Sequence, residues 1–164
     1  MDFQEKKIFR NIYDKRLEAV NIPSDIEYYN FIQKKSLDGL RQIIITSDLM
    51  LKIIKEYFLN NKAKIISFEL MQDDEEFYIN CKKNIEKMNC DRGYFQVFFE
   101  QVKYLYSKEC IDIKSCRFKY RNENDNAIDI TLYINGNLSI GKNDSTEFEV
   151  KMLLEKIKGF SKGE

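Results

Sequence analysis

The chain contains no histidine among its 164 residues. Histidine is the commonest general base, the base of most catalytic triads and the commonest metal ligand. Its absence argues against triad hydrolases and against metal enzymes that depend on imidazole ligands. Carboxylates, lysine and tyrosine can still support catalysis, but no intact catalytic motif is present. We therefore predict a protein that is not an enzyme.

An excess of charge of one sign is also missing. The 27 lysines and arginines balance the 27 aspartates and glutamates, so the formal net charge is zero. Nucleic-acid coat proteins derive their affinity from excess base, and acidic mimics of nucleic acid need the opposite bias. The balance argues against both classes for the chain as a whole, while a local patch of either sign remains compatible with it.

Targeting segments, long apolar runs and paired cysteines are missing as well. The N-terminal stretch MDFQEKKIFR lacks the apolar core of a signal peptide, and no run approaches the ~20 apolar residues of a membrane span. Cys81, Cys90, Cys110 and Cys116 form no C-x-x-C pair, which favours reduced thiols over a zinc site. We expect a cytoplasmic protein with no membrane association, no metal and no cofactor.

Proline and glycine are scarce, with one proline and six glycines in the chain. Few breaks predict long regular elements. Apolar residues make up 43% of the chain, which is too many for a disordered protein without net charge. The length suits one domain, so we treat 1–164 as a single α+β domain.

The N-terminal two-thirds are predicted to be mainly helical. Residues 3–19 place apolar side chains at helical spacing with charges between them, which predicts an amphipathic helix. The residues of this stripe are Ile8, Ile12, Tyr13, Leu17 and Val20. Ser24 and Glu27 have the spacing of a capping box and predict a second helix over 25–34.

The middle of the chain contains one ambiguous stretch. RQIIIT alone is typical of a strand, yet residues 36–60 carry two adjacent apolar stripes at helical spacing, which predicts one long, largely buried helix. Residues 64–70 alternate and predict a strand. Residues 73–88 are compatible with a helix or a hairpin, of which we favour the helix, and 94–108 predict a further helix.

The C-terminal third has the clearest pattern. Apolar and polar residues alternate over 111–121 and 127–134, and Leu138 and Ile140 continue the alternation. This predicts a three-stranded antiparallel meander with one buried and one polar face, followed by a helix over 146–159. The predicted fold is therefore α+β: a helical N-terminal two-thirds packed with a C-terminal meander and its following helix.

Residues 136–143, GNLSIGKN, resemble a phosphate-binding P-loop. The spacing G-x-x-x-x-G-K is present, but Asn143 replaces the Ser or Thr that would bind Mg²⁺. Leu138 and Ile140 alternate with polar residues as a strand requires, whereas a phosphate cradle is an irregular turn. We therefore interpret the motif as the second half of a β-hairpin.

The parity of the strands predicts how they pair. Opposed residues of an antiparallel pair point to the same face. A three-residue loop that ends at Gly136 opposes Leu132 to Leu138 and gives Gly136 the left-handed conformation of a bulged hairpin. The same test on the preceding loop opposes Lys119 to Asp129.

The best candidate for a partner-binding site is a basic stripe on the polar face of the meander. Arg117, Lys119 and Arg121 alternate along one strand, and Tyr133 lies on the same face. Such residues can follow a phosphate backbone or an acidic protein surface, and a tyrosine can stack on a base. The simpler interpretation, which the alternation itself favours, is a solvated face in which Lys119 pairs with Asp129.

Two groups of carboxylates are weaker candidates. The run DDEE at 73–76 could hold Mg²⁺, but consecutive carboxylates also suit the positive end of a helix dipole. Glu149 and Lys151 spell the E-x-K of some metal-dependent nucleases, beside which Asp112 and Lys114 could be set. That signature belongs on a strand, whereas Glu149 lies in a predicted helix.

These observations favour a non-enzymatic intracellular protein that binds a macromolecule, with a protein as the first choice of partner. An inhibitor that acts by protein–protein contact, such as an immunity protein or a phage-encoded anti-defence protein, fits a small, neutral chain without catalytic motifs. This expectation rests on elimination and on analogy of type. The alternatives are a nucleic-acid-binding module that uses the basic sheet face and, third, a carboxylate–metal nuclease.

Overall fold

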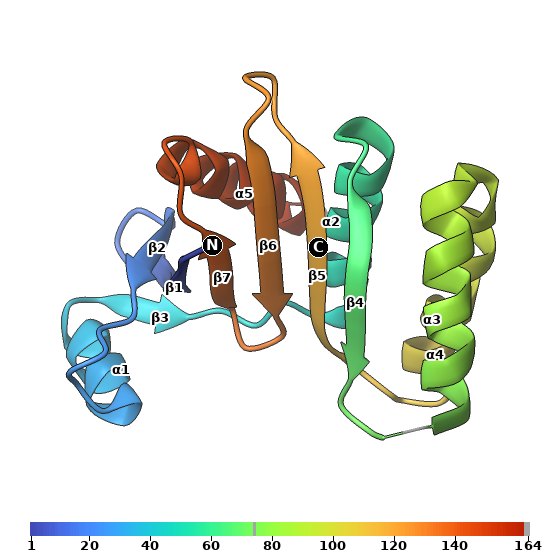
Figure 1. Cartoon of the computed structure of the whole chain (residues 1–164). Helices are drawn as coiled ribbons and strands as arrows, with labels where there is room; N and C mark the ends of the chain where they lie inside the picture. Colours follow the sequence, from blue (N-terminus) through green and yellow to red (C-terminus); the bar gives the residue numbers. More distant parts are fainter. Residues whose placement is uncertain (74, 163–164) are drawn as a thin grey trace.

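The computed structural model describes residues 1–73 and 75–162. Within these ranges, seven strands form an antiparallel sheet of order β2-β1-β7-β6-β5-β4, and β3 pairs with β1 off this path (Figure 1). The strands are β1 (Phe3–Asn11), β2 (Leu17–Asn21), β3 (Leu40–Gln42), β4 (Lys64–Leu70), β5 (Ile113–Arg121), β6 (Ala127–Tyr133) and β7 (Asn137–Gly141). The helices are α1 (Tyr28–Leu37), α2 (Ser47–Asn60), α3 (Glu75–Cys90), α4 (Phe95–Lys108) and α5 (Thr146–Ser161).

The helices are distributed unevenly around the sheet. Helices α2 and α5 lie behind β4–β7 in Figure 1, α3 and α4 lie beside the edge strand β4, and α1 lies at the other end near β3. No described helix lies in front of β4–β7 in this view. One face of these four strands is therefore covered by helices and the other is not.

Both predicted registers are confirmed, but the predicted three-stranded sheet is wrong, because β5, β6 and β7 are part of a seven-stranded sheet that continues into β4 on one side and β1 on the other. Lys119 is opposite Asp129 in the β5–β6 pair, and Leu132 is opposite Leu138 in the β6–β7 pair. Gly136 has φ +79°, as the bulged hairpin requires. The P-loop-like glycines and lysine thus belong to the hairpin and to the exit from β7, with Asn137–Gly141 in a regular strand.

The core forms where the meander faces α2 and α5. The apolar members of the alternation point to these helices, and the Tyr57 ring of α2 lies 4.7 Å from the Phe118 ring of β5. The buried strand residues of this face are Cys116, Phe118, Tyr120, Ile128, Ile130, Leu132, Leu138 and Ile140. Burial of this one face fixes the register, because a slip by one residue would bring the charged side chains into the core.

The predicted helical N-terminal two-thirds are wrong, since residues 3–19 form most of the β1–β2 hairpin instead. The cause is that both faces of β1 are covered near its end. Ile8 joins the main core, whereas the next residue, Phe9, packs with Phe31 of α1 and Leu40 of β3 on the other side. A strand buried on both faces loses the alternation by which strands are recognised.

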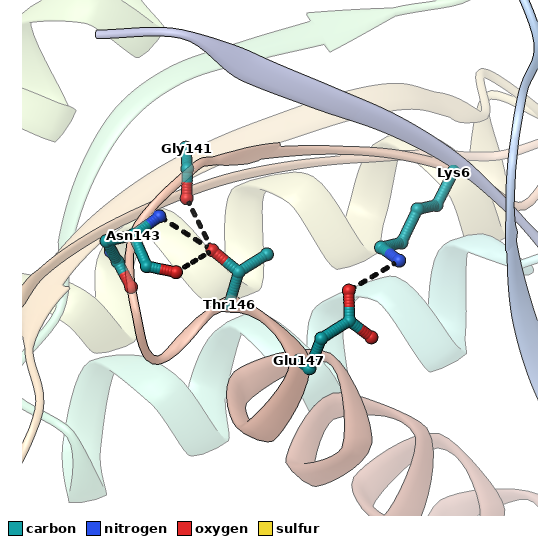
Figure 2. A network of polar contacts seen from close by, with 5 residues as sticks. All are labelled: Lys6, Gly141, Asn143, Thr146 and Glu147. Carbon is teal, nitrogen blue, oxygen red and sulfur yellow. Dashed lines mark hydrogen bonds and ion pairs between the residues drawn. The ribbon is translucent and has the colours of Figure 1, made fainter.

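Two buried lysines add to the irregular pattern of β1. The side chains of Lys6 and Lys7 are almost fully buried, although consecutive lysines normally indicate an exposed surface. Lys6 pairs with Glu147 at the start of α5, with 2.9 Å between Nζ and Oε1 (Figure 2). Lys7 donates a hydrogen bond to the backbone carbonyl of Asn135 in the β6–β7 turn. The lysines thus tie β1 to the C-terminal elements.

The single long helix predicted over 36–60 is also wrong before residue 47. Gly39 has φ +82°, which suits glycine and separates α1 from β3. The backbone N–H of Ile45 then bonds to the carbonyl of Ile134, so the chain stays extended. Helix α2 begins after Thr46, whose hydroxyl accepts a hydrogen bond from the N–H of Leu49. From there on, the predicted buried helix is confirmed.

The remaining predicted elements are present with small shifts at their ends. The strand over 64–70 and the helices over 73–88 and 94–108 correspond to β4, α3 and α4. Helix α1 begins at Tyr28 without a side-chain cap, so the capping box assigned to 25–34 is wrong.

A small polar network starts α5 (Figure 2). The hydroxyl of Thr146 accepts a hydrogen bond from the N–H of Asn143 at 2.8 Å and lies within hydrogen-bond distance of the Gly141 and Asn143 carbonyls. The side-chain oxygen of Asn143 accepts from the N–H of Ser145. These contacts turn the chain from β7 into α5 within a few residues.

Side chains of α3 protect the edge strand β4. The amide of Asn89 bonds both to the N–H and to the carbonyl of Ile65, as a neighbouring strand would. The hydroxyl of Tyr78 contacts the N–H and the carbonyl of Leu70 in the same way. An unpaired edge invites aggregation, so this pairing explains why α3 lies beside β4.

The hairpin geometry predicts opposite effects for two Gly→Ala substitutions. Gly136→Ala places a Cβ 2.8 Å from the Ile43 carbonyl in a left-handed conformation, so we expect the free energy of unfolding to fall by about 1–3 kcal/mol. Gly159→Ala in α5 meets no atom within 4 Å and should raise it by about 0.5–1 kcal/mol. Urea denaturation measures both, and equal effects would contradict the assigned turn.

The burial of Lys7 predicts that the free energy of unfolding changes with pH in the alkaline range. Burial lowers the pKa of Lys7 to about 8, from about 10.5. Between these values the unfolded chain binds more protons than the folded one, so stability rises with pH over this range. The unfolding free energy of the wild type relative to Lys7→Met should rise by about 1–3 kcal/mol across it. The exposed control Lys83→Met should keep the wild-type profile, and a flat difference for Lys7→Met would contradict the burial.

Candidate partner-binding face

The polar side chains of β4–β7 form a surface that we call the open face, on the side of the sheet opposite α2 and α5. Its rows follow the strand pairing, in which residues of neighbouring strands stand side by side. One row is Ser67, Arg117, Thr131, Ser139 and Glu5, and the next contains Lys64, Lys119 and Asp129. The meander thus brings its own charged residues next to those of β4 and β1.

A hollow of about 730 Å³ lies at one end of the open face. Five cationic side chains and one carboxylate line it: Lys62, Lys64, Arg117, Lys119, Arg121 and Asp129. Its apolar lining comes from Met1, Phe3, Tyr120, Ala127 and Ile128. The volume lies in the range of ligand-binding clefts, and the excess of cations suits a negatively charged ligand.

Asp129 is the centre of this charge cluster. Its side chain is 5% exposed and accepts two hydrogen bonds from Arg117, from Nε at 2.9 Å and from Nη2 at 2.7 Å. Lys119 approaches the same carboxylate, with 3.2 Å between Nζ and Oδ2. The ring of Phe3 lies 5.7 Å from the guanidinium carbon of Arg117. The guanidinium is therefore held from two sides.

The protonation of this cluster follows from its contacts. Burial acts to raise the pKa of Asp129, but hydrogen bonds from Arg117 and Lys119 outweigh it and lower that pKa below its usual range. The hydrogen bonds to Asp129 raise the pKa of Arg117. The carboxylate and the guanidinium are therefore both ionised at neutral pH.

The opposite end of the open face has a different character. Tyr133 lies there opposite Ser115, four residue pairs along the β5–β6 ladder from Lys119 and Asp129, and does not line the hollow. Burial, followed by the charges of Glu5 and Glu69, raises the pKa of Tyr133. The open face thus has a basic end and an end where charges of both signs, Glu5, Glu69 and Lys114, lie near a tyrosine.

The structure brings together three of the four predicted binding residues. Arg117, Lys119 and Arg121 share the hollow, and the predicted pairing of Lys119 with Asp129 is present. Their role in binding, like that of Tyr133, stays a prediction. Three features escaped sequence reasoning: Lys62, Lys64 and the two-point contact of Arg117 with Asp129. That contact could have been found, because Arg117 is diagonal to Asp129 in the predicted register.

The residues set together as a nuclease signature do not assemble. Glu149 is buried, and its carboxylate accepts hydrogen bonds from the Tyr120 hydroxyl at 2.5 Å and the Asn122 amide at 3.0 Å. Asp112 lies at the other end of β5, where it accepts a hydrogen bond from the Ser47 hydroxyl at 2.6 Å. At about 3.3 Å per residue, the length of β5 separates the two carboxylates by roughly 25 Å.

The other polar candidates are also accounted for locally. Glu75 and Glu76 occupy the first turn of α3, where carboxylates complement the helix dipole, while Asp74 lies outside the described residues. Cys81 and Cys116 are buried, and Cys90 and Cys110 are exposed. Among the residues that the structure describes, no group of three or more cysteine, aspartate or glutamate side chains could hold a metal ion.

Comparison with known proteins adds no identification. No protein-family model matches the chain, and no curated protein or solved structure is significantly similar to it. Within residues 1–73 and 75–162, no helix combines the length and the apolarity needed to cross a lipid bilayer. The candidate site is therefore defined by its geometry and charge alone.

Proposed function

We propose that the chain is a non-enzymatic binding protein that acts by contact with a partner protein, and that the open face is its docking surface. The main observation in support of this proposal is the hollow, which is lined by five cationic side chains, one carboxylate and several apolar residues. The chain has no net charge overall, so this concentration of cations is local. Such a patch suits a partner with an acidic surface.

The distribution of charge favours a protein over a nucleic acid. A phosphate backbone is negative along its whole length, so a protein that follows it needs cations along the track. Among the described residues of the open face, cations are in excess only at the hollow, because at the Tyr133 end Lys114 pairs with Glu69 and Glu5 adds a second carboxylate. A protein surface with charges of both signs can complement both ends.

The proposed class of action is inhibition, of the kind exerted by immunity proteins or phage-encoded antagonists of host defence. Such a protein covers a functional surface of its target and needs a shaped, charged face rather than catalytic groups. The burial of Glu149 and its separation from Asp112 support this choice, since these carboxylates form no shared site.

The experiment uses the full chain as bait in an extract of its native cell, followed by purification of the captured partner. Calorimetry then compares the wild type with Lys62→Glu/Lys64→Glu. Both lysines are exposed, so these changes reverse charge at the hollow and leave the residues of the contact between Arg117 and Asp129 unchanged. We expect the affinity to fall about tenfold or more.

The matched control is Lys83→Glu/Lys108→Glu, which makes the same change of charge at exposed positions of α3 and α4. It should bind as the wild type does. Equal affinity for the wild type and the hollow variant would refute the open face as the docking surface. If the bait instead captures nucleic acid, with an affinity that falls steeply with salt, the proposed protein partner is wrong and the chain binds a phosphate backbone.

A further inference from the structure

We infer that the hollow is a carboxylate-binding site, in which Arg117 binds an acidic side chain of the partner while the apolar lining receives an adjacent apolar side chain. The inference rests on the proposed function, because it names the chemical group that the docking surface recognises. Asp129 acts in this site as a positioning residue for Arg117.

The donors of Arg117 point to a carboxylate. A guanidinium has five N–H groups, and Asp129 takes one from Nε and one from Nη2. Three N–H groups remain, and no other acceptor among the described residues takes them. A planar pair of N–H groups matches the two oxygens of a carboxylate, a geometry that a lysine ammonium does not provide.

Asp129 fixes the orientation of these remaining donors. Its almost completely buried carboxylate holds the guanidinium at two points, and the Phe3 ring lies against it. A free arginine side chain would lose rotamer freedom on binding, whereas one already held loses less. The negative charge of Asp129 therefore serves a site for anions, because it aligns the group that binds them.

The surrounding cations and apolar groups define the rest of the ligand. Lys62, Lys64 and Arg121 add positive charge around Arg117 and attract acidic segments. The large apolar side chains of the lining that are open to a ligand are Met1 and Phe3, which are 72% and 37% exposed. An acidic residue beside an apolar one thus complements the hollow better than an acidic residue among polar ones.

The test measures binding of a short fluorescein-labelled peptide, in which glutamates alternate with phenylalanines, by fluorescence anisotropy. Arg117→Lys keeps the charge but loses the planar pair of donors, so we expect the affinity to fall about tenfold. Asp129→Asn removes a negative charge from the hollow and nevertheless should weaken binding by a similar factor. A site that acts through its net charge alone predicts the reverse for Asp129→Asn and no change for Arg117→Lys.

Matched peptides identify the recognised groups. Glutamine in place of glutamate should abolish binding, and serine in place of phenylalanine should weaken it. Thermal melting checks that each variant is folded. If Asp129→Asn does not fold, the result for Arg117→Lys tests the inference by itself.

Each contrary result has a distinct meaning. One such result is that Lys62→Glu/Lys64→Glu weakens binding of the partner, while neither Arg117→Lys nor Asp129→Asn weakens binding of the peptide. In that case the carboxylate site is wrong and the proposed docking surface stands. If the wild-type protein does not bind the glutamate–phenylalanine peptide, the carboxylate site is likewise wrong. If it then binds an oligothymidylate with steep salt dependence, phosphate is the ligand and the protein partner is wrong too.

Discussion

The carboxylate of Asp129 faces the open side of the sheet and is almost completely buried there by the side chains around it. An isolated charge in such a place costs several kcal/mol, so it needs partners of opposite sign. Arg117 and Lys119 provide them and are themselves drawn together by it. The arrangement of the basic side chains, and with it the shape of the hollow, depends on this ion pair.

The fold places these groups by simple rules of strand geometry. Helices cover only one face of β4–β7, so apolar and polar residues must alternate along each strand. Strand pairing then sets Lys119 beside Asp129 and Lys64 beside Lys119. The open face is thus the necessary polar side of a sheet whose other side forms the core.

The sequence predicted most of what this polar side contains, because its pattern there is local. The alternation on β5 and β6 was enough to pair Lys119 with Asp129 and to place Tyr133 on the same face. Nothing local shows that Lys62 and Lys64 join the hollow, since this follows from the pairing of β4 with β5 across more than 40 intervening residues. The prediction for the N-terminal strands failed for a related reason. Distant elements bury β1 on both faces, so its sequence lacks the alternation of a strand.

The central claim is that Asp129 holds Arg117 in a fixed orientation before any partner binds. Nitrogen-detected NMR of the arginine side chains tests it directly in the free protein. The Nε–H of Arg117 should exchange slowly with water and its terminal nitrogens should rotate slowly, in contrast to the exposed Arg41. Exchange and rotation as fast in Arg117 as in Arg41 would contradict the account, because the guanidinium would then be free and the hollow would have no organised donor.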